Sequence, residues 1–468
     1  MANRPPEGPD LPGGDGPEDP FSDDAFPFAE IFSQLGIPLP KQGDQVDLAA
    51  ILQGLQDLMA RSGQQMTTPS GGVNWDFAKD TARKSVAVLG PDPTPSSRER
   101  HEVADAVHLA ELWLNSATTF PAVPAAPAAW SRAEWVEATM PTWQTMVEPI
   151  VTSIATSLGA VMTDRMAEDP QLTGIQQMFQ PMLQHSAASM FGAQLGQAIG
   201  KLATEVVSAT DVGMPLTSKP QVALLPTNLA SFGEGLDLPA RDVTLYLALR
   251  EAARQRLFSE VAWLGPQLVA LVQHYAREIT IDLSALEQNL DLGTGESLSL
   301  DQLNELGQEF SRNLFSPSRT SEQDAILGRL ETLLALVEGW VDDAVTQATA
   351  AYMPSAVALS ELVRRRRAAG GPAERVLASL VGLELHPRRV RDAANLWAAV
   401  RADRGVDGRD AVWQHPDSLP TAADLDDPLG FVTGDSRQAD DLDAELARLL
   451  DQATRDRDQE GPADGAAR

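Results

Sequence analysis

One stretch of the chain carries charged side chains with the spacing of a catalytic metal motif. Arg250, Glu251 and Arg254 lie within residues 238–264, LPARDVTLYLALREAARQRLFSEVAWL. In the H-E-x-x-H motif, two histidines four residues apart share a helix face and bind zinc, and the glutamate acts as general base on the metal-bound water. Here arginine stands at both histidine positions. Because a guanidinium stays protonated and is not a zinc ligand, the spacing alone predicts no standard zinc site.

The same stretch is predicted to form a helix that is buried on nearly all sides. Pro239 suits the first turn of a helix, where its missing N–H costs nothing. Apolar residues recur at helical spacing on the face of the two arginines, and Leu and Ala residues cover the opposite face. Charged groups in such a helix are costly unless they are paired and hydrogen-bonded. We therefore expect Arg250 and Arg254 to have carboxylate partners.

The sequence around this stretch resembles a known bacterial family. The segments that carry the resemblance are TLYLALREAARQRLF (244–258), VAWLGPQLVALVQHYAREI (261–279), VNWDFAKDTARKSV (73–86), AELWLNSAT (110–118), WSRAEWVEATMPTW (130–143), FGEGLDLP (232–239), LVEGWVDDAV (336–345) and residues 364–432. They resemble zincin-like metallopeptidases, whose members are often named only as hydrolases and are partly associated with deazaflavin-cofactor biosynthesis. The resemblance covers most of residues 70–433.

The resemblance implies a mainly α-helical, zincin-like domain with at most a small β element. It places the family's metal motif on Arg250, Glu251 and Arg254, with Glu251 at the position of the general base. Glu338 of LVEGW is the candidate for the third, carboxylate ligand. Since both histidines are replaced, we expect a protein of a hydrolase family that has lost its zinc site, needs no cofactor, and acts as a non-catalytic scaffold or partner-binding protein. The alternative is an active metal-dependent hydrolase or peptidase that uses Glu251 and zinc with a non-standard ligand set.

If the resemblance holds, the two arginines replace the metal by an ion pair. We expect Arg254 to meet Glu338 across a helix pair, with Arg250 and Glu251 close by, so that two positive and two negative groups balance in a buried site. A third hypothesis starts from the fork formed by the two guanidinium groups, which suits a carboxylate or a phosphate. The protein would then bind an anion.

Two other groups of residues have the spacing of metal ligands. His274 and Glu278 lie four residues apart, and with Glu251 and Glu338 they could form a different metal site. A single histidine there is more often a hydrogen-bonded structural residue. The other group is His101 to Asp105, with His108 further on, in a helix that is predicted to be amphipathic and to face solvent.

Composition excludes several classes of partner and chemistry. The chain has 36 Lys and Arg residues against 66 Asp and Glu residues, a formal net charge of −30, so we expect neither nucleic acid nor an anionic membrane surface as a partner. There is no cysteine, and therefore no thiolate nucleophile or thiolate metal site. No P-loop, Rossmann or G-x-S-x-G motif occurs.

Neither a signal peptide nor a membrane span is expected. The N-terminus lacks a basic segment followed by an apolar run. Residues 149–163 lack charge but are too few to cross a bilayer, and residues 171–200 contain several glutamines and are interrupted by Pro181. We therefore expect a cytoplasmic protein with a protein partner that the sequence does not identify.

Four regions are predicted along the chain. Residues 1–72 form a disordered N-terminal region, rich in Pro, Gly and acidic residues at its start, with one possible amphipathic helix at 46–59. Residues 73–355 form the zincin-like helical core, and residues 356–433 form the C-terminal helical part of the same body. Residues 434–468 form an acidic, disordered tail.

Local signals predict several helix boundaries. Asn74 is a plausible N-cap, and Ser131 with Glu134 forms a capping box. Pro141 is predicted to end the helix that begins there, so that the next helix spans about Thr142 to Met166. Further helices are expected at 97–115, 266–279, 283–290, 300–315, 321–350 and 356–369.

Three further patterns bear on packing and charge. Gly192, Gly196 and Gly200 lie four residues apart, which allows a neighbouring helix to approach closely; in a membrane the same spacing would form a dimer seam. Residues 221–225 (QVALL), between two prolines, are the best candidate for a strand. Arg364 to Arg367 form a basic run that could bind phosphate, but a solvated or internally paired face is the more frequent arrangement.

Overall fold

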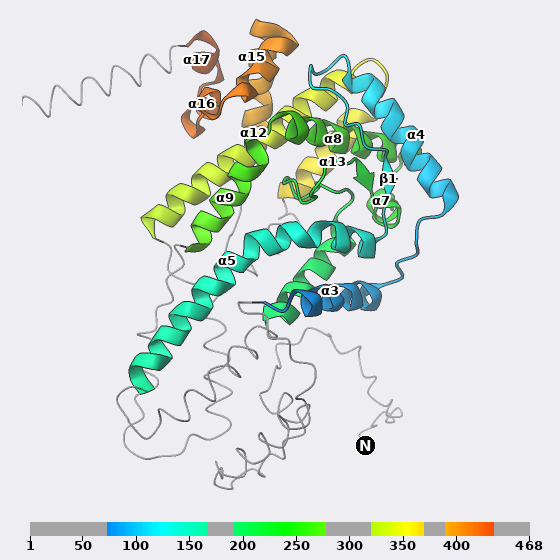
Figure 1. Cartoon of the computed structure of the whole chain (residues 1–468). Helices are drawn as coiled ribbons and strands as arrows, with labels where there is room; N and C mark the ends of the chain where they lie inside the picture. Colours follow the sequence, from blue (N-terminus) through cyan, green and yellow to red (C-terminus); the bar gives the residue numbers. More distant parts are fainter. Residues whose placement is uncertain (1–72, 167–190, 278–319, 369–388, 435–468) are drawn as a thin grey trace, which may run out of the picture. The chain divides into compact units, whose positions relative to one another are not determined.

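The computed structural model describes residues 73–166, 191–277, 320–368 and 389–434 (Figure 1). All of them belong to the compact unit formed by Pro69–Asp282 and Asn313–Arg468. Within these ranges the chain is mainly α-helical, with one pair of two-residue strands, which confirms the predicted fold class. The terminal regions predicted to be disordered, the possible helix at 46–59, and the helices expected at 283–290 and 300–315 lie outside the described residues.

Helix α8 (Ala240–Glu260) is buried as its sequence predicts. Every residue from Leu245 to Leu257 is buried, including the three arginines and the glutamate among them. The helix packs against α4 (Ser97–Leu114) on one side and α12 (Ser321–Thr349) on the other. Because no solvent is available along this length, each charged side chain of α8 must find its partner within the protein.

Helix α12 connects α8 to the C-terminal part of the unit. It packs against α9 (Leu264–Arg277), α13 (Ala356–Ala368) and α15 (Val390–Ala411). Gly339 allows the close approach of α15, because a Cβ atom added there would lie 2.6 Å from the Cβ of Ala393. The short elements that follow α15 are two 3-10 helices, Val412–Gln414 and Pro416–Ser418, and the helices α16 (Ala422–Asp426) and α17 (Pro428–Thr433).

Helix α3 (Trp75–Leu89) begins at its predicted N-cap. The Asn74 side chain accepts a hydrogen bond from the backbone N–H of Phe77 at 3.0 Å. The helical residues 191–205 lie against α3, and a Cβ atom added to Gly196 would lie 2.4 Å from the backbone oxygen of Ala78. The glycine spacing therefore allows a neighbouring helix to approach closely, which is the first of the two interpretations given above.

Helix α5 (Arg132–Met166) corrects one prediction. The helix starts at the predicted capping box, where Ser131 Oγ accepts from the backbone N–H of Glu134 and Glu134 accepts from the N–H of Ser131. It then continues through Pro141 and Pro149, whereas we expected a break at Pro141. Helix α5 packs against α3 and α9, and these contacts offset the hydrogen bond that a proline removes.

The β structure consists of two short strands that come from distant parts of the chain. Strand β1 (Ala128–Ala129) pairs in parallel with β2 (Ala223–Leu224), which confirms a strand within the predicted residues 221–225. Leu224 also forms an antiparallel bridge with Ser208. Helix α7 (Pro226–Gly233) follows β2. This pairing fixes residues 207–210 close to α8, where they contribute to the site described below.

Candidate functional site

The two arginines of the motif positions bind carboxylates of α12. Arg254 Nε lies 2.7 Å from Glu338 Oε1, and Arg250 Nη2 lies 2.7 Å from Glu338 Oε2. Arg250 Nη1 also donates to Asp342. All four side chains are at most 2% exposed. The ion pair expected between Arg254 and Glu338 is therefore present, and Asp342, one turn further along α12, is a second partner that we did not predict.

Glu251 turns to a different set of partners. Its Oε2 accepts from Ser208 Oγ at 2.7 Å, Thr210 Oγ1 at 2.6 Å and the Thr210 N–H at 3.2 Å, and its Oε1 accepts from Gln255 Nε2 at 2.9 Å. Burial raises the pKa of the Glu251 carboxyl, while Arg254 and these donors oppose the rise. A carboxylate accepts about four hydrogen bonds. The protein itself therefore satisfies Glu251, and a water molecule would have to displace one of these donors to be activated.

Helix α13 brings a second layer of arginines to the same carboxylates. Arg364 Nε lies 3.1 Å from Asp342 Oδ2, and Arg367 Nη2 lies 3.0 Å from Glu338 Oε1. The basic run is thus paired within the protein, one of the two expected arrangements, and two of its four arginines bind buried acids of α12. We call the seven groups Arg250, Arg254, Arg364, Arg367, Glu251, Glu338 and Asp342 the ion cluster.

The ion cluster keeps its central carboxylate ionised. Burial alone raises the pKa of Glu338, but Arg254, Arg367 and Arg250 reverse this effect and hold the pKa well below its usual range. Four guanidinium groups surround three carboxylates, so the balance of two positive and two negative groups that we expected is incomplete. An ion cluster of this kind is stable only when every member is paired, because one uncompensated buried charge is strongly destabilising.

His274, the histidine of the alternative metal site, lies away from the ion cluster. His274 Nε2 lies 3.8 Å from Glu322 Oε1, and its side chain is half exposed. Glu322 precedes Glu338 by sixteen residues on α12, a distance of about 24 Å along a helix. The structure therefore does not bring His274 together with Glu251 and Glu338, and Glu278 lies outside the described residues.

The group at His101 faces solvent on α4, as expected. His101, Asp105 and His108 are exposed, while Glu102 binds Arg98 on the same helix. In the part of the chain that the structure describes, no group of three or more His, Asp or Glu side chains could hold a metal ion. At the motif positions, the atoms directed at Glu338 are guanidinium nitrogens. The residues of the ion cluster do not fit a zinc ion.

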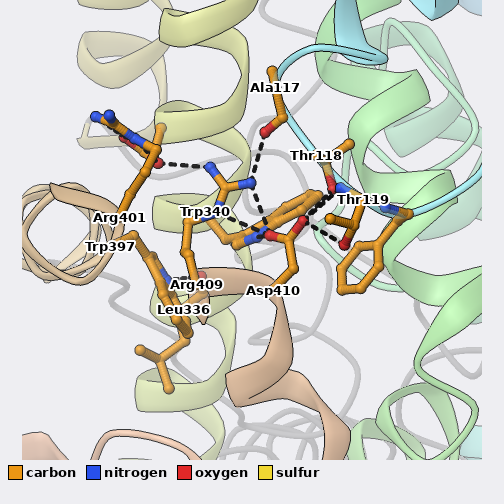
Figure 2. Close-up of polar contacts among 11 residues, drawn as sticks. Ala117, Thr118, Thr119, Leu336, Trp340, Trp397, Arg401, Arg409 and Asp410 are labelled. Carbon is orange, nitrogen blue, oxygen red and sulfur yellow. Dashed lines mark hydrogen bonds and ion pairs between the residues drawn. The ribbon is translucent and has the colours of Figure 1, made fainter. Parts of the chain in front are cut away.

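A second buried group of charges fixes α15 to the rest of the unit (Figure 2). Asp410 accepts from Thr118 Oγ1 at 2.7 Å, the Thr119 N–H at 2.8 Å and Trp340 Nε1 at 2.9 Å. Arg409 donates to Asp343 Oδ2 at 2.7 Å and to the backbone oxygen of Ala117 at 2.7 Å. These contacts join α12, α15 and the loop after α4, and we did not predict them.

Arg256, the third arginine of α8, points to the α4 side. It donates to Glu111 Oε2 at 2.6 Å, to Asn115 Oδ1 at 2.8 Å and to the backbone oxygen of Phe120 at 3.1 Å. Only its position in a stretch that is apolar on nearly all sides signalled that Arg256 is buried. The residues that α8 directs to α12 and to α4 together determine how the helix is packed.

The fold and the ion cluster define a mainly helical protein with a central buried helix whose arginines pair with carboxylates of α12 and α4. The chain belongs to the zincin-like metallopeptidase family, since the sequence model of that family matches residues 73–432. A crystal structure from Chloroflexus aurantiacus, described as a "putative hydrolase with a novel fold", has a similar fold with a TM-score of 0.51 at 19% identity. The similarity covers 78% of this chain and 99% of that one. No curated protein matches the chain.

Among the described helices, none is long and apolar enough to cross a membrane.

Proposed function

We propose that this protein is a member of the zincin-like family in which an ion cluster replaces the zinc site, and that it acts as a non-catalytic scaffold or partner-binding protein. The observation that supports this proposal is that arginines stand at both histidine positions of the motif and bind Glu338. Arg250 and Arg254 are each within 2.7 Å of Glu338, the candidate for the third ligand. A cation placed among these groups would meet two guanidinium groups at close range, and the repulsion would oppose its binding.

The environment of Glu251 supports the same proposal. A general base must be within hydrogen-bond reach of the proton that it removes, either directly or through a water molecule. Both oxygens of Glu251 accept from side chains or backbone of the protein, and Glu251 is fully buried. In the proposed function, this carboxylate supports the packing of residues 208–210 on α8.

The second candidate function is a metal-dependent hydrolase with a non-standard ligand set. The raised pKa of Glu251 favours it, because burial is a common means of tuning a carboxylate for acid–base chemistry. The catalytic class of the family as a whole also favours it. The hydrolase requires a bound metal ion and a catalytic Glu251, whereas the scaffold requires neither.

Elemental analysis of the full-length protein purified without added metal tests the proposal. We expect well under one equivalent of zinc, and no change in the thermal unfolding midpoint on addition of a chelator, because a metal that bound the native state would stabilise it. Stoichiometric zinc whose removal lowers the unfolding midpoint would contradict the proposal and support the hydrolase.

The variant Arg250→His/Arg254→His provides a comparison for the same assay. If the arginines are what opposes zinc, this variant should bind zinc more tightly than the wild type in a titration, provided that circular dichroism shows it folded. In parallel, wild type and Glu251→Gln should hydrolyse a panel of peptide and ester substrates at the same background rate. A loss of hydrolysis in Glu251→Gln that tracks bound metal would establish the second candidate.

A further inference from the structure

Helix α13 is attached to the unit in two different ways along its length. Its first half is fixed by apolar contacts, since Ala356 and Leu359 are buried, and by Ser355 Oγ, which lies 2.6 Å from Asp242 Oδ2 at the start of α8. Its last turn carries Arg364 to Arg367 and buries one apolar side chain, Val363. Charge rather than apolar area therefore holds the last turn in place.

The last turn lies between the solvent and the buried carboxylates. The side chains of Arg364 and Arg367 are 33% and 17% exposed, whereas their partners Asp342 and Glu338 are at most 2% exposed. Arg366 is 28% exposed and lies 3.8 Å from Asp211, which is 16% exposed. Arg367 also donates to the backbone oxygen of Asp211 at 3.2 Å, and Arg366 donates to the backbone oxygen of Glu205. In addition, Arg366 lies over the ring of Phe232, 5.3 Å from its centroid.

The inner part of the ion cluster does not need α13 to hold together. Glu338 keeps contacts of 2.7 Å with both Arg250 and Arg254, and these three groups are fixed by the packing of α8 on α12. Without α13, two guanidinium groups would face three carboxylates, so the inner part would carry a net negative charge. The outer arginines complete the neutralisation of Glu338 and Asp342 and exclude solvent from them.

We propose that the last turn of α13 is a salt-sensitive cover of the ion cluster, which opens while α8 and α12 stay packed. Partly exposed ion pairs are weakened by salt, because the screening length falls from about 10 Å at 0.1 M to about 3 Å at 1 M, whereas buried pairs are screened much less. Opening admits solvent and small ions to Glu338 and Asp342 from the α13 side. The cover does not depend on whether the ion cluster binds a metal.

Hydrogen exchange of the full-length protein, followed by mass spectrometry of peptides, tests this cover. Between about 0.1 M and about 1 M sodium chloride, amides of residues 363–368 should exchange faster by up to about fivefold, the change expected for losing one partly exposed ion pair. Amides in the middle of α8 and α12 should keep their protection. The cover is wrong if residues 363–368 exchange at the same rate at both salt concentrations, or if α8 and α12 lose protection together with them.

Variants test the same cover at low salt. Arg367→Gln removes the contact with Glu338 and should speed the exchange of residues 363–368 by a similar factor. Arg365→Gln is the matched control, because Arg365 is 76% exposed and its ion-pair partner among the described residues is Glu361 on its own helix. Equal exchange in the two variants would contradict the cover. Should Arg367→Gln fail to fold, Arg364→Gln, which removes the partly exposed contact with Asp342, serves the same comparison.

Discussion

Three guanidinium groups converge on the single carboxylate of Glu338, and this convergence governs the expected response to mutation. Glu338→Gln removes the negative charge and leaves Arg250, Arg254 and Arg367 with less compensation. We expect a loss of ~3–5 kcal/mol in the free energy of unfolding, the typical cost of breaking a buried ion pair. Denaturant unfolding measures it. Glu361→Gln, on the exposed face of α13, is the control and should cost little.

A double-mutant cycle separates the pair Arg254–Glu338 from the rest of the ion cluster. Arg254→Met with Glu338→Gln should recover part of the loss, because neither partner is then left alone in a buried site. A coupling energy near zero between the two positions would mean that they do not interact in solution. Since Arg250 and Arg367 also contact Glu338, we expect the recovery to be incomplete.

The stability that Glu338 contributes should depend on pH with a defined sign. Its folded-state pKa is depressed, so its contribution is fully present above the unfolded value near 4.5 and is lost as the pH falls toward the folded-state pKa. Glu251 has a raised pKa and acts in the opposite sense. The difference in stability between wild type and Glu338→Gln should therefore shrink between about pH 5 and about pH 2, as measured by unfolding at each pH. A difference that stays constant would contradict the pKa assignment.

The sequence indicated the pair at the centre of the ion cluster but not its full extent. Arg254 and Glu338 could be connected because both belong to segments that resemble the family. Asp342 carried a usable signal, since it lies four residues after Glu338 and so shares its helix face. Arg364 and Arg367 could not be assigned partners, because only the tertiary packing of α13 brings them to α12.

At the scale of elements, the contact between α3 and residues 191–205 depends on the absence of side chains. A Cβ atom at Gly196 would lie 2.4 Å from a backbone oxygen of α3, so the two helices would have to separate. Gly196→Ala should therefore destabilise the protein by ~1–3 kcal/mol, the usual cost of overpacking. Gly328→Ala, on an exposed face of α12 with no atom within 4 Å, should instead stabilise it by ~0.5–1 kcal/mol. Thermal unfolding of both variants provides the comparison.

Helix boundaries were predictable where side chains cap the backbone and not where packing overrides local preference. Asn74 and the pair Ser131 and Glu134 act within three residues of the helix start, so their effect is visible in the sequence. Pro141 is a helix breaker by local rules, yet α5, which packs against α3 and α9, continues through it. A local rule contains no information about such contacts.

At the scale of the whole molecule, stability should come from the residues around α8. Residues 1–25 and 456–468 have little apolar content, and such segments cannot bury enough apolar surface to offset the entropy of ordering. Removing both should leave the midpoint of cooperative unfolding nearly unchanged, as measured by calorimetry of the shortened and full-length proteins. A large drop would show that these residues pack on the folded unit.

Two routes of polar contacts join α8 to α12. The direct route runs from Arg250 to Asp342. The other starts at Arg256, passes through the loop that contains Thr118 and Phe120 to Asp410 and Arg409, and ends at Asp343, next to Asp342. Because residues in one network of contacts are often coupled, we expect mutations in the two routes to be non-additive in the free energy of unfolding.

The bond between Thr118 and Asp410 also has a consequence for synthesis on the ribosome. The two residues are 292 positions apart in the chain. At about 5–20 residues per second, Asp410 is made about 15–60 s after Thr118. Until then the hydroxyl of Thr118 and the indole N–H of Trp340 lack the acceptor that they have in the finished protein. The nascent chain must remain incompletely closed during this interval, so α15 and the short elements after it are the last to join the unit.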